Sequence, residues 1–145
     1  MRVRFLAVVA IAMVVWGAAA PAAPFSLYGV RMGMTRDEVG KLWAPLESGQ
    51  YYIKDSVLFE VVPSFDHEDR LYQVSFSVPL VGEYPEHLTA TAFQNLVTRL
   101  WGDDRAVSLS VRVGRGTGQV TVTHKARLEA FTRHIETVLA PLIRP

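Results

Sequence analysis

Cysteine is absent from all 145 residues of the chain. Without it no disulfide can stabilise the fold, and no thiolate can serve as a nucleophile, a zinc ligand or the attachment point of a lipid. The sequence also lacks a Gly-x-Ser-x-Gly nucleophile elbow and any pair of histidines at metal-binding spacing on one helix. We therefore predict that the protein is not an enzyme, that it uses no metal or cofactor, and that its stability depends on an apolar core.

A surplus of charge of one sign is missing as well. The chain has 15 Lys and Arg residues against 14 Asp and Glu residues, and the two kinds are interspersed. Proteins that bind nucleic acid concentrate basic residues in a patch or stripe, which neutralises phosphates. The composition therefore argues against nucleic acid as a partner.

A long apolar run of membrane-spanning length is the third absence. The run from Phe5 to Trp16 is shorter than the roughly 20 residues that a transmembrane helix needs. Arg2 and Arg4 precede it and small residues follow it, which is the order of a secretory signal peptide. We predict that residues 1–22 are a signal peptide and that 23–145 form a single exported α+β domain, periplasmic or secreted, with no stable membrane anchor.

Two cleavage sites fit the small-residue rule. Cleavage after Ala20 would leave Pro21 at the new N-terminus, which is unfavourable, so we prefer cleavage after Ala22, with Ala23 as the first mature residue. Removal of Arg2 and Arg4 leaves 13 basic residues against 14 acidic residues, a net charge of −1.

A capping box marks the first predicted helix. The Thr35 hydroxyl can accept from the backbone N–H of Glu38, and the Glu38 side chain can reach back to Thr35. The helix should end near Ala44, because the residue before a proline avoids helical geometry. Its predicted apolar face consists of Val39, Leu42, Trp43 and Leu46.

Hydrophobic periodicity predicts the remaining elements. Extended segments are expected at 51–54, 57–62 and 71–78, a helix at 91–101, a hairpin over 107–123 and a last helix at 126–140 that Pro141 ends. The last helix should turn Leu128, Phe131, Ile135, Val138 and Leu139 inward. The order α-β-β-α-β-β-α predicts an antiparallel sheet with helices packed on one face. Leu42-Trp43 and Leu100-Trp101 end the first two helices alike and suggest a duplication.

Alternation along the predicted strands defines a candidate partner surface opposite the helices. Its members are small hydroxyl side chains and one arginine: Ser75, Ser77, Ser108, Ser110, Arg112, Thr121 and Thr123. Such residues offer many hydrogen-bonding groups at low conformational cost. They are also common on any solvated sheet face, which is the simpler interpretation.

Two further motifs have structural explanations. The run from Asp66 to Asp69 could bind a cation, but consecutive side chains point apart and the spacing of a calcium loop is missing, so a solvated turn is favoured. The glycines from Gly114 to Gly118 lie between two strands rather than before a helix. They therefore indicate a hairpin turn rather than a phosphate-binding loop.

One segment resembles a known family. Gly33, Met34, Thr35 and Val39 are similar to the Gly-Met-Thr-x-x-x-Val opening of the outer-membrane assembly lipoprotein family (SmpA, also called BamE). Phe65-Asp66, followed by Arg70-Leu71 entering a strand, also looks like that group, which shares its fold with the β-lactamase inhibitor protein. The similarity covers about residues 28–78.

The resemblance implies a helix-on-sheet module that binds other proteins. The chain departs from the family in lacking the lipid-bearing cysteine and in adding a third helix and a second hairpin, so it looks like a tandem of the unit. We therefore expect an exported cell-envelope module whose partner is another envelope protein. The alternative is a periplasmic domain that binds a small ligand or an envelope polymer between sheet and helices.

Overall fold

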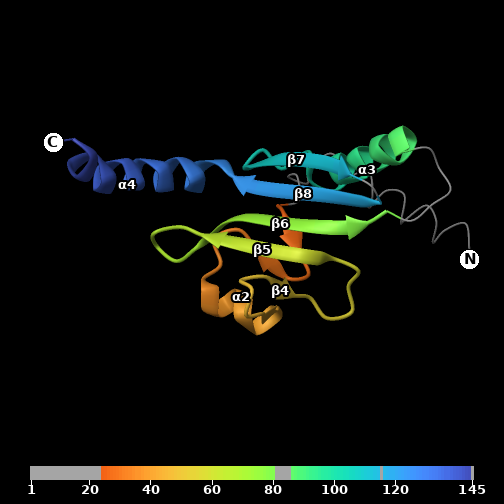
Figure 1. Ribbon diagram of the computed structural model, residues 1–145, viewed down its shortest axis with the longest axis horizontal. Coiled ribbons are helices and arrows are strands. Elements are labelled where there is room, and N and C mark those ends of the chain that lie inside the picture. Colours follow the sequence, from red (N-terminus) through yellow and green to blue (C-terminus); the bar gives the residue numbers. More distant parts are fainter. Residues whose placement is uncertain (1–23, 81–85, 115, 145) are drawn as a thin grey trace, which may run out of the picture.

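The computed structural model describes residues 24–80, 86–114 and 116–144 (Figure 1), so the predicted signal peptide and its cleavage sites lie outside the described residues. The fold is α+β. The elements are β1 (Ser26–Leu27), β2 (Val30–Arg31), α2 (Arg36–Leu42), β3 (Ala44–Pro45), β4 (Tyr51–Tyr52), β5 (Phe59–Phe65), β6 (Leu71–Pro79), α3 (Glu86–Trp101), β7 (Val107–Gly114), β8 (Thr117–His124) and α4 (Lys125–Ile143).

The strands form a six-stranded antiparallel sheet of order β3-β4-β5-β6-β8-β7, and β1 pairs with β2 in a separate hairpin. β6 therefore lies beside β8, the second strand of the C-terminal hairpin, and joins the two halves of the chain. The predicted order of elements is right only in its coarse form. β4 falls within the extended segment expected at 51–54, but β1, β2 and β3 are additional strands, because periodicity cannot be detected in a two-residue segment.

The capping box forms at the start of α2. The Thr35 hydroxyl accepts from Glu38 N at 3.3 Å and donates to the Glu38 carboxylate at 3.2 Å. The helix ends at Leu42, earlier than predicted, and Trp43 is its C-cap. Val39 and Trp43 are buried as expected, but Leu42 and Leu46 are about half exposed.

One core lies on the apolar side of the sheet, as the alternation predicts. It contains Val74 and Phe76 from β6 and Val120 and Val122 from β8, and the β1–β2 hairpin contributes Phe25, Leu27 and Val30. α3 packs over β7 and β8 through the buried side chains of Phe93 and Val97. Gly118 makes this possible, because a Cβ there would lie 2.5 Å from the Phe93 ring.

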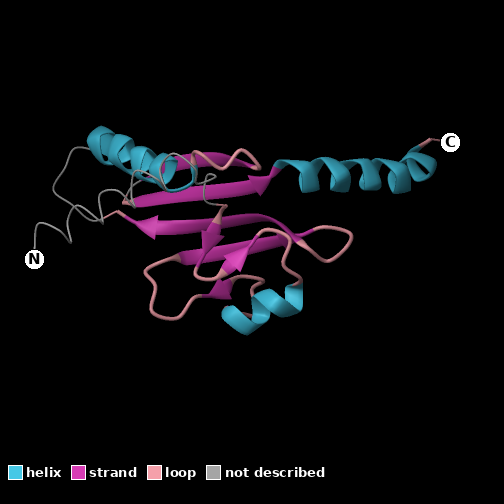
Figure 2. Cartoon of the chain, turned by 180° about the vertical axis from the view of Figure 1, so that it is seen from behind, coloured by secondary structure: helices cyan, strands magenta, loops and turns pink. Residues whose placement is uncertain are grey.

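The last helix contradicts two predictions. α4 does not pack on the sheet but runs past its end, as Figures 1 and 2 show from opposite sides, and no α4 residue in the described chain is buried. Leu128, Ile135, Val138 and Leu139, expected to face inward, are more than a third exposed. The helix also continues through Pro141 to Ile143. Hydrophobic periodicity predicts that a helix has an apolar face, but it does not predict which part of the protein packs against that face.

Candidate binding surfaces

The strand registers place the predicted partner surface on one side of the sheet. Ser110 lies opposite Thr121, which lies opposite Ser75, so one row crosses β7, β8 and β6. In a parallel row Ser108 lies opposite Thr123, and in a third Arg112 lies opposite Gln119. Residues directly opposite in neighbouring strands share a face of the sheet.

Burial separates one member from the rest of this set. Ser108, Ser110 and Arg112 are exposed, and the threonines of β8 and Ser75 are half-buried, as expected for central strands of an open face. Ser77, however, is only 1% exposed, so its assignment to an exposed surface is wrong. We call the remaining set the hydroxyl face: Ser75, Ser108, Ser110, Arg112, Thr121 and Thr123.

A bulge in β5 explains the burial of Ser77. The register between β5 and β6 shifts between Phe59 and Val62, and Glu60 within the shift has a φ of 51°. Ser77 donates from its hydroxyl to the Glu60 carboxylate at 3.2 Å. A bulge redirects side chains locally, and the alternation of β6 alone cannot reveal it.

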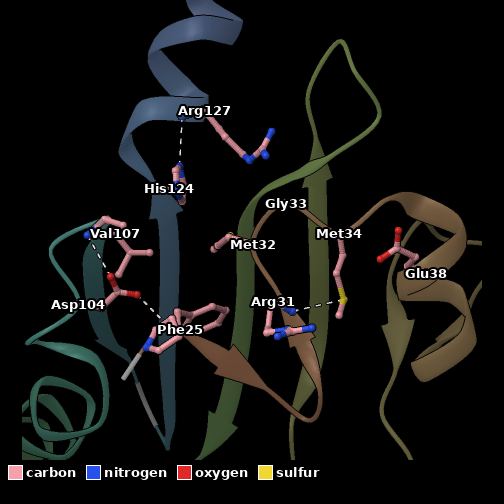
Figure 3. A pocket seen from close by; sticks show the side chains of 12 residues that line it. Phe25, Arg31, Met32, Gly33, Met34, Glu38, Asp104, Val107, His124 and Arg127 are labelled. Carbon is pink, nitrogen blue, oxygen red and sulfur yellow. Dashed lines mark hydrogen bonds between the residues drawn. The ribbon is translucent and has the colours of Figure 1, made fainter. Parts of the chain in front are cut away.

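A second candidate is a pocket at the end of the sheet (Figure 3). Its volume is about 500 Å³, within the range of small-ligand sites. The β1–β2 region, α2 and the β7–β8 hairpin all contribute to it. The lining residues are Pro24, Phe25, Arg31, Met32, Gly33, Met34, Glu38, Asp104, Ala106, Val107, His124 and Arg127.

Both apolar and charged groups line this pocket. Phe25 and Val107 are buried core side chains, and Met32 and Met34 pack against the same core. The Asp104 carboxylate is already engaged, because it accepts from Phe25 N at 2.7 Å and from Ala106 N at 3.0 Å. Pro24 and Phe25 thus form one wall of the pocket. Hydrophobic periodicity in the sequence could not predict that they lie beside β7.

Arg127 links the pocket to the acidic turn. Its guanidinium lies 3.4 Å from the Asp66 carboxylate and rests over Gly33, where a Cβ would approach it to 3.1 Å. Gly33 has a φ of 88°, which favours glycine for a second reason. The backbone conformation therefore favours glycine at this position of the Gly-Met-Thr opening, and a side chain there would also require the Arg127 guanidinium to shift.

His124 caps α4 beside the pocket. Its Nδ1 accepts from Arg127 N at 3.2 Å, so this nitrogen is unprotonated and Nε2 carries the proton. Desolvation by burial lowers the pKa of His124 below 6.5, and the nearby Arg127 charge lowers it further, although Asp104 opposes both. Neither the cap nor the pocket was predicted. The helical periodicity beginning after His124 is the signal that could have identified the cap.

The acidic turn is structural rather than simply solvated. Asp66 is a buried carboxylate that accepts from Glu68 N at 2.9 Å and Arg70 N at 3.0 Å. His67 stacks on His134 of α4 with ring centroids 4.1 Å apart. Together with the Arg127 ion pair, these contacts attach the first turns of α4 to the β5–β6 connection.

Two observations concern metals and membranes. Within the described ranges, His, Asp and Glu side chains nowhere gather in a group of three that could hold a metal ion. No described helix combines the length and apolar character that crossing a membrane requires.

Comparison with known proteins adds no relative to this description. Protein-family models, curated proteins and solved structures were each searched with the chain, and none of the three searches finds a match.

Proposed function

We propose that this chain is an exported protein-binding module of the cell envelope, similar in role to the assembly and inhibitor modules that its opening resembles. The observation that carries the proposal is the hydroxyl face. Across β6, β8 and β7 it presents an ordered grid of small hydroxyl groups with Arg112 as the one long charged side chain.

The hydroxyl face suits a protein partner better than a small molecule. Ser and Thr side chains lose little conformational entropy when they become ordered. The Thr121 hydroxyl donates to Ser75 Oγ at 3.4 Å, so part of the grid is already fixed before a partner arrives. Arginine is enriched among the residues that contribute most to protein interfaces, because its planar group offers five donors.

The test is capture of a partner from an envelope fraction with matched variants. Arg112→Ala and Ser110→Glu should leave the urea midpoint nearly unchanged, since exposed substitutions usually stay within about 0.5 kcal/mol. Partner affinity should fall by about 2 kcal/mol or more for Arg112→Ala if it is a hot spot. Arg133→Ala, an exposed arginine on α4, serves as the control.

Two results would overturn this proposal. If a partner binds all three variants and the parent chain equally, the hydroxyl face is not the docking surface. If no stoichiometric protein is captured while a small molecule occupies the pocket, the second candidate function replaces the first.

That second candidate is a periplasmic ligand-binding domain, and the pocket of about 500 Å³ is the observation in its favour. Its apolar side chains and Arg31, which forms no ion pair among the described residues, suit a small carboxylate with an apolar body. Titration with octanoate, followed by backbone NMR, should then shift the resonances of Met32 and Val107, and Arg31→Gln should weaken the effect. Unchanged spectra at millimolar octanoate would eliminate this ligand class.

A further inference from the structure

The two edges of the six-stranded sheet are protected very differently. β3 forms one edge and has only two residues, one of them Pro45. β7 forms the other edge and has eight residues without a proline, and Arg112 is its one charged side chain. Within the described chain no strand pairs with the outer side of β7. A long edge strand without such protection is a template for another strand.

The hairpin register shows which backbone groups of β7 are free to pair. Only two residues separate Gly114 from Thr117, which are register partners, so these two must be a hydrogen-bonded pair. Bonded pairs alternate along an antiparallel ladder. Ser108, Ser110 and Arg112 therefore bond to β8. The alternate residues Leu109, Val111 and Val113 direct their N–H and C=O groups outward.

Two exposed leucines of α3, Leu96 and Leu100, accompany this free edge, and we call them the apolar ledge. On α3, Trp101 packs against Phe76 of β6 with ring centroids 6.0 Å apart, so that flank of the helix points toward the centre of the sheet. Helical periodicity places Leu96 and Leu100 on the opposite flank, toward β7. They are 45% and 54% exposed, and on the same side of the sheet Leu109, Val111 and Val113 of β7 are only partly buried.

We propose that a second copy of this chain occupies this edge. The two β7 strands pair antiparallel about a two-fold axis at Ser110, and α3 packs against α3 of the partner subunit. Leu109 then pairs with Val111 of the partner subunit, and Arg112 lies opposite Ser108 of the partner subunit. The apolar sides of both sheets coincide, and the two hydroxyl faces become one continuous surface.

Three properties favour a second copy over an unrelated strand. The outward-bonding residues of β7 meet outward-bonding residues of its copy, as an antiparallel ladder requires. Pairing about Ser110 aligns almost the whole strand without opposing like charges, whereas pairing about Arg112 would set two guanidinium groups face to face, which is destabilising. The leucines of α3 add helix contacts to the strand pair. These contacts enlarge the buried surface toward the total of about 1,200 Å² that specific interfaces need.

Sedimentation equilibrium on the mature full-length chain tests the proposal. The parent chain should show a concentration-dependent monomer–dimer equilibrium. Val111→Pro removes an N–H that β8 does not use, and Leu100→Glu places a charge on the ledge. Each should weaken dimerisation at least tenfold while circular dichroism and the urea midpoint show a folded monomer.

Two further variants separate this interface from others. Ser108→Glu should tighten the dimer about threefold, because a carboxylate then faces Arg112 of the partner subunit, and Ser108→Lys should weaken it. Leu142→Glu, at an exposed apolar position of α4, should have no effect. A parent chain that stays monomeric at millimolar concentration overturns the proposal. So does a dimer that is insensitive to Val111→Pro and Leu100→Glu, or one that Leu142→Glu dissociates.

Discussion

At the scale of single residues, two positions carry requirements that their neighbours do not share. At Gly118 on β8 the Phe93 ring of α3 occupies the space that a side chain would need. Gly114 lies in the same hairpin, but a Cβ added there would meet nothing within 4 Å. Of these two glycines in one motif, only Gly118 is required by packing.

Gly118→Ala should therefore destabilise the protein by about 1–3 kcal/mol, because the added methyl group displaces Phe93 from the core. Gly114→Ala changes the same chemical group in open space and should stay within about 0.5 kcal/mol. Urea unfolding of both variants measures the difference. Equal midpoints would show that α3 does not press on Gly118.

The cap at His124 makes stability depend on pH. Its native pKa lies below 6.5, so between 6.5 and that lower value the unfolded chain binds more protons than the folded chain. This contribution to stability is complete above pH 6.5 and is lost as the pH falls. Protonation of Nδ1 would also remove the acceptor that caps α4.

We expect His124→Asn to reduce the loss of stability between pH 7.5 and pH 5.5. Asparagine retains a side-chain oxygen that can cap the helix but does not titrate. Urea midpoints of the parent and the variant at both pH values provide the comparison, in which all other titrating groups are shared. An identical loss in the two proteins would contradict the assignment of this pH dependence to His124.

At the scale of elements, α4 is anchored at one end. The ring centroids of Phe131 and Tyr72 of β6 are 5.3 Å apart, and His67 stacks on the Phe131 ring. Farther along, Leu142 is 77% exposed and Ile143 is 72% exposed. Helices in folded proteins gain most of their stability from tertiary packing, so the two ends of α4 should differ in what they contribute.

Phe131→Ala should lower the free energy of unfolding by about 1 kcal/mol or more, because aromatic contacts and buried area are lost together. Leu142→Ala should change it by less than about 0.5 kcal/mol in the monomer. Chemical unfolding at a protein concentration below the dimerisation range gives both values. A larger effect at Leu142 would mean that the end of α4 is packed in solution.

At the scale of the whole molecule, the first described residues are part of the fold. Phe25 is 2% exposed, donates its N–H to Asp104 and packs its ring 5.0 Å from that of Trp101. Any processing must therefore leave Phe25 in place. Both cleavage sites considered from the sequence, after Ala20 and after Ala22, satisfy this requirement.

We predict that residues 1–22 are removed as a signal peptide, so N-terminal sequencing of the exported protein should begin near Ala23. The reason is the order of charged, apolar and small residues that signal peptidases recognise. Recovery of intact chains beginning at Met1 from a cytoplasmic fraction would refute export. A mature chain beginning after Phe25 should have lost stability, since the hydrogen bond to Asp104 would be missing.

Local patterns were enough for several elements. The capping box located the start of α2, and alternation located β6 and the β7–β8 hairpin, because these signals arise within a few consecutive residues. The order of apolar and polar positions also placed the hydroxyl face on one side of the sheet. The start of α3 at Glu86 was missed, since its first turns lack the apolar stripe that marks the helix from Phe93 onward.

What the sequence by itself determined is therefore the type of each long element and, for the β7–β8 hairpin, the face it buries, because both follow from side-chain period and local capping. Tertiary structure alone decided which elements meet. It buried Ser77 through a bulge in another strand, seated Asp66 beneath Arg127 across 61 residues, and directed α4 past the sheet instead of onto it. These outcomes depend on contacts between residues far apart in the chain, and no local period records them.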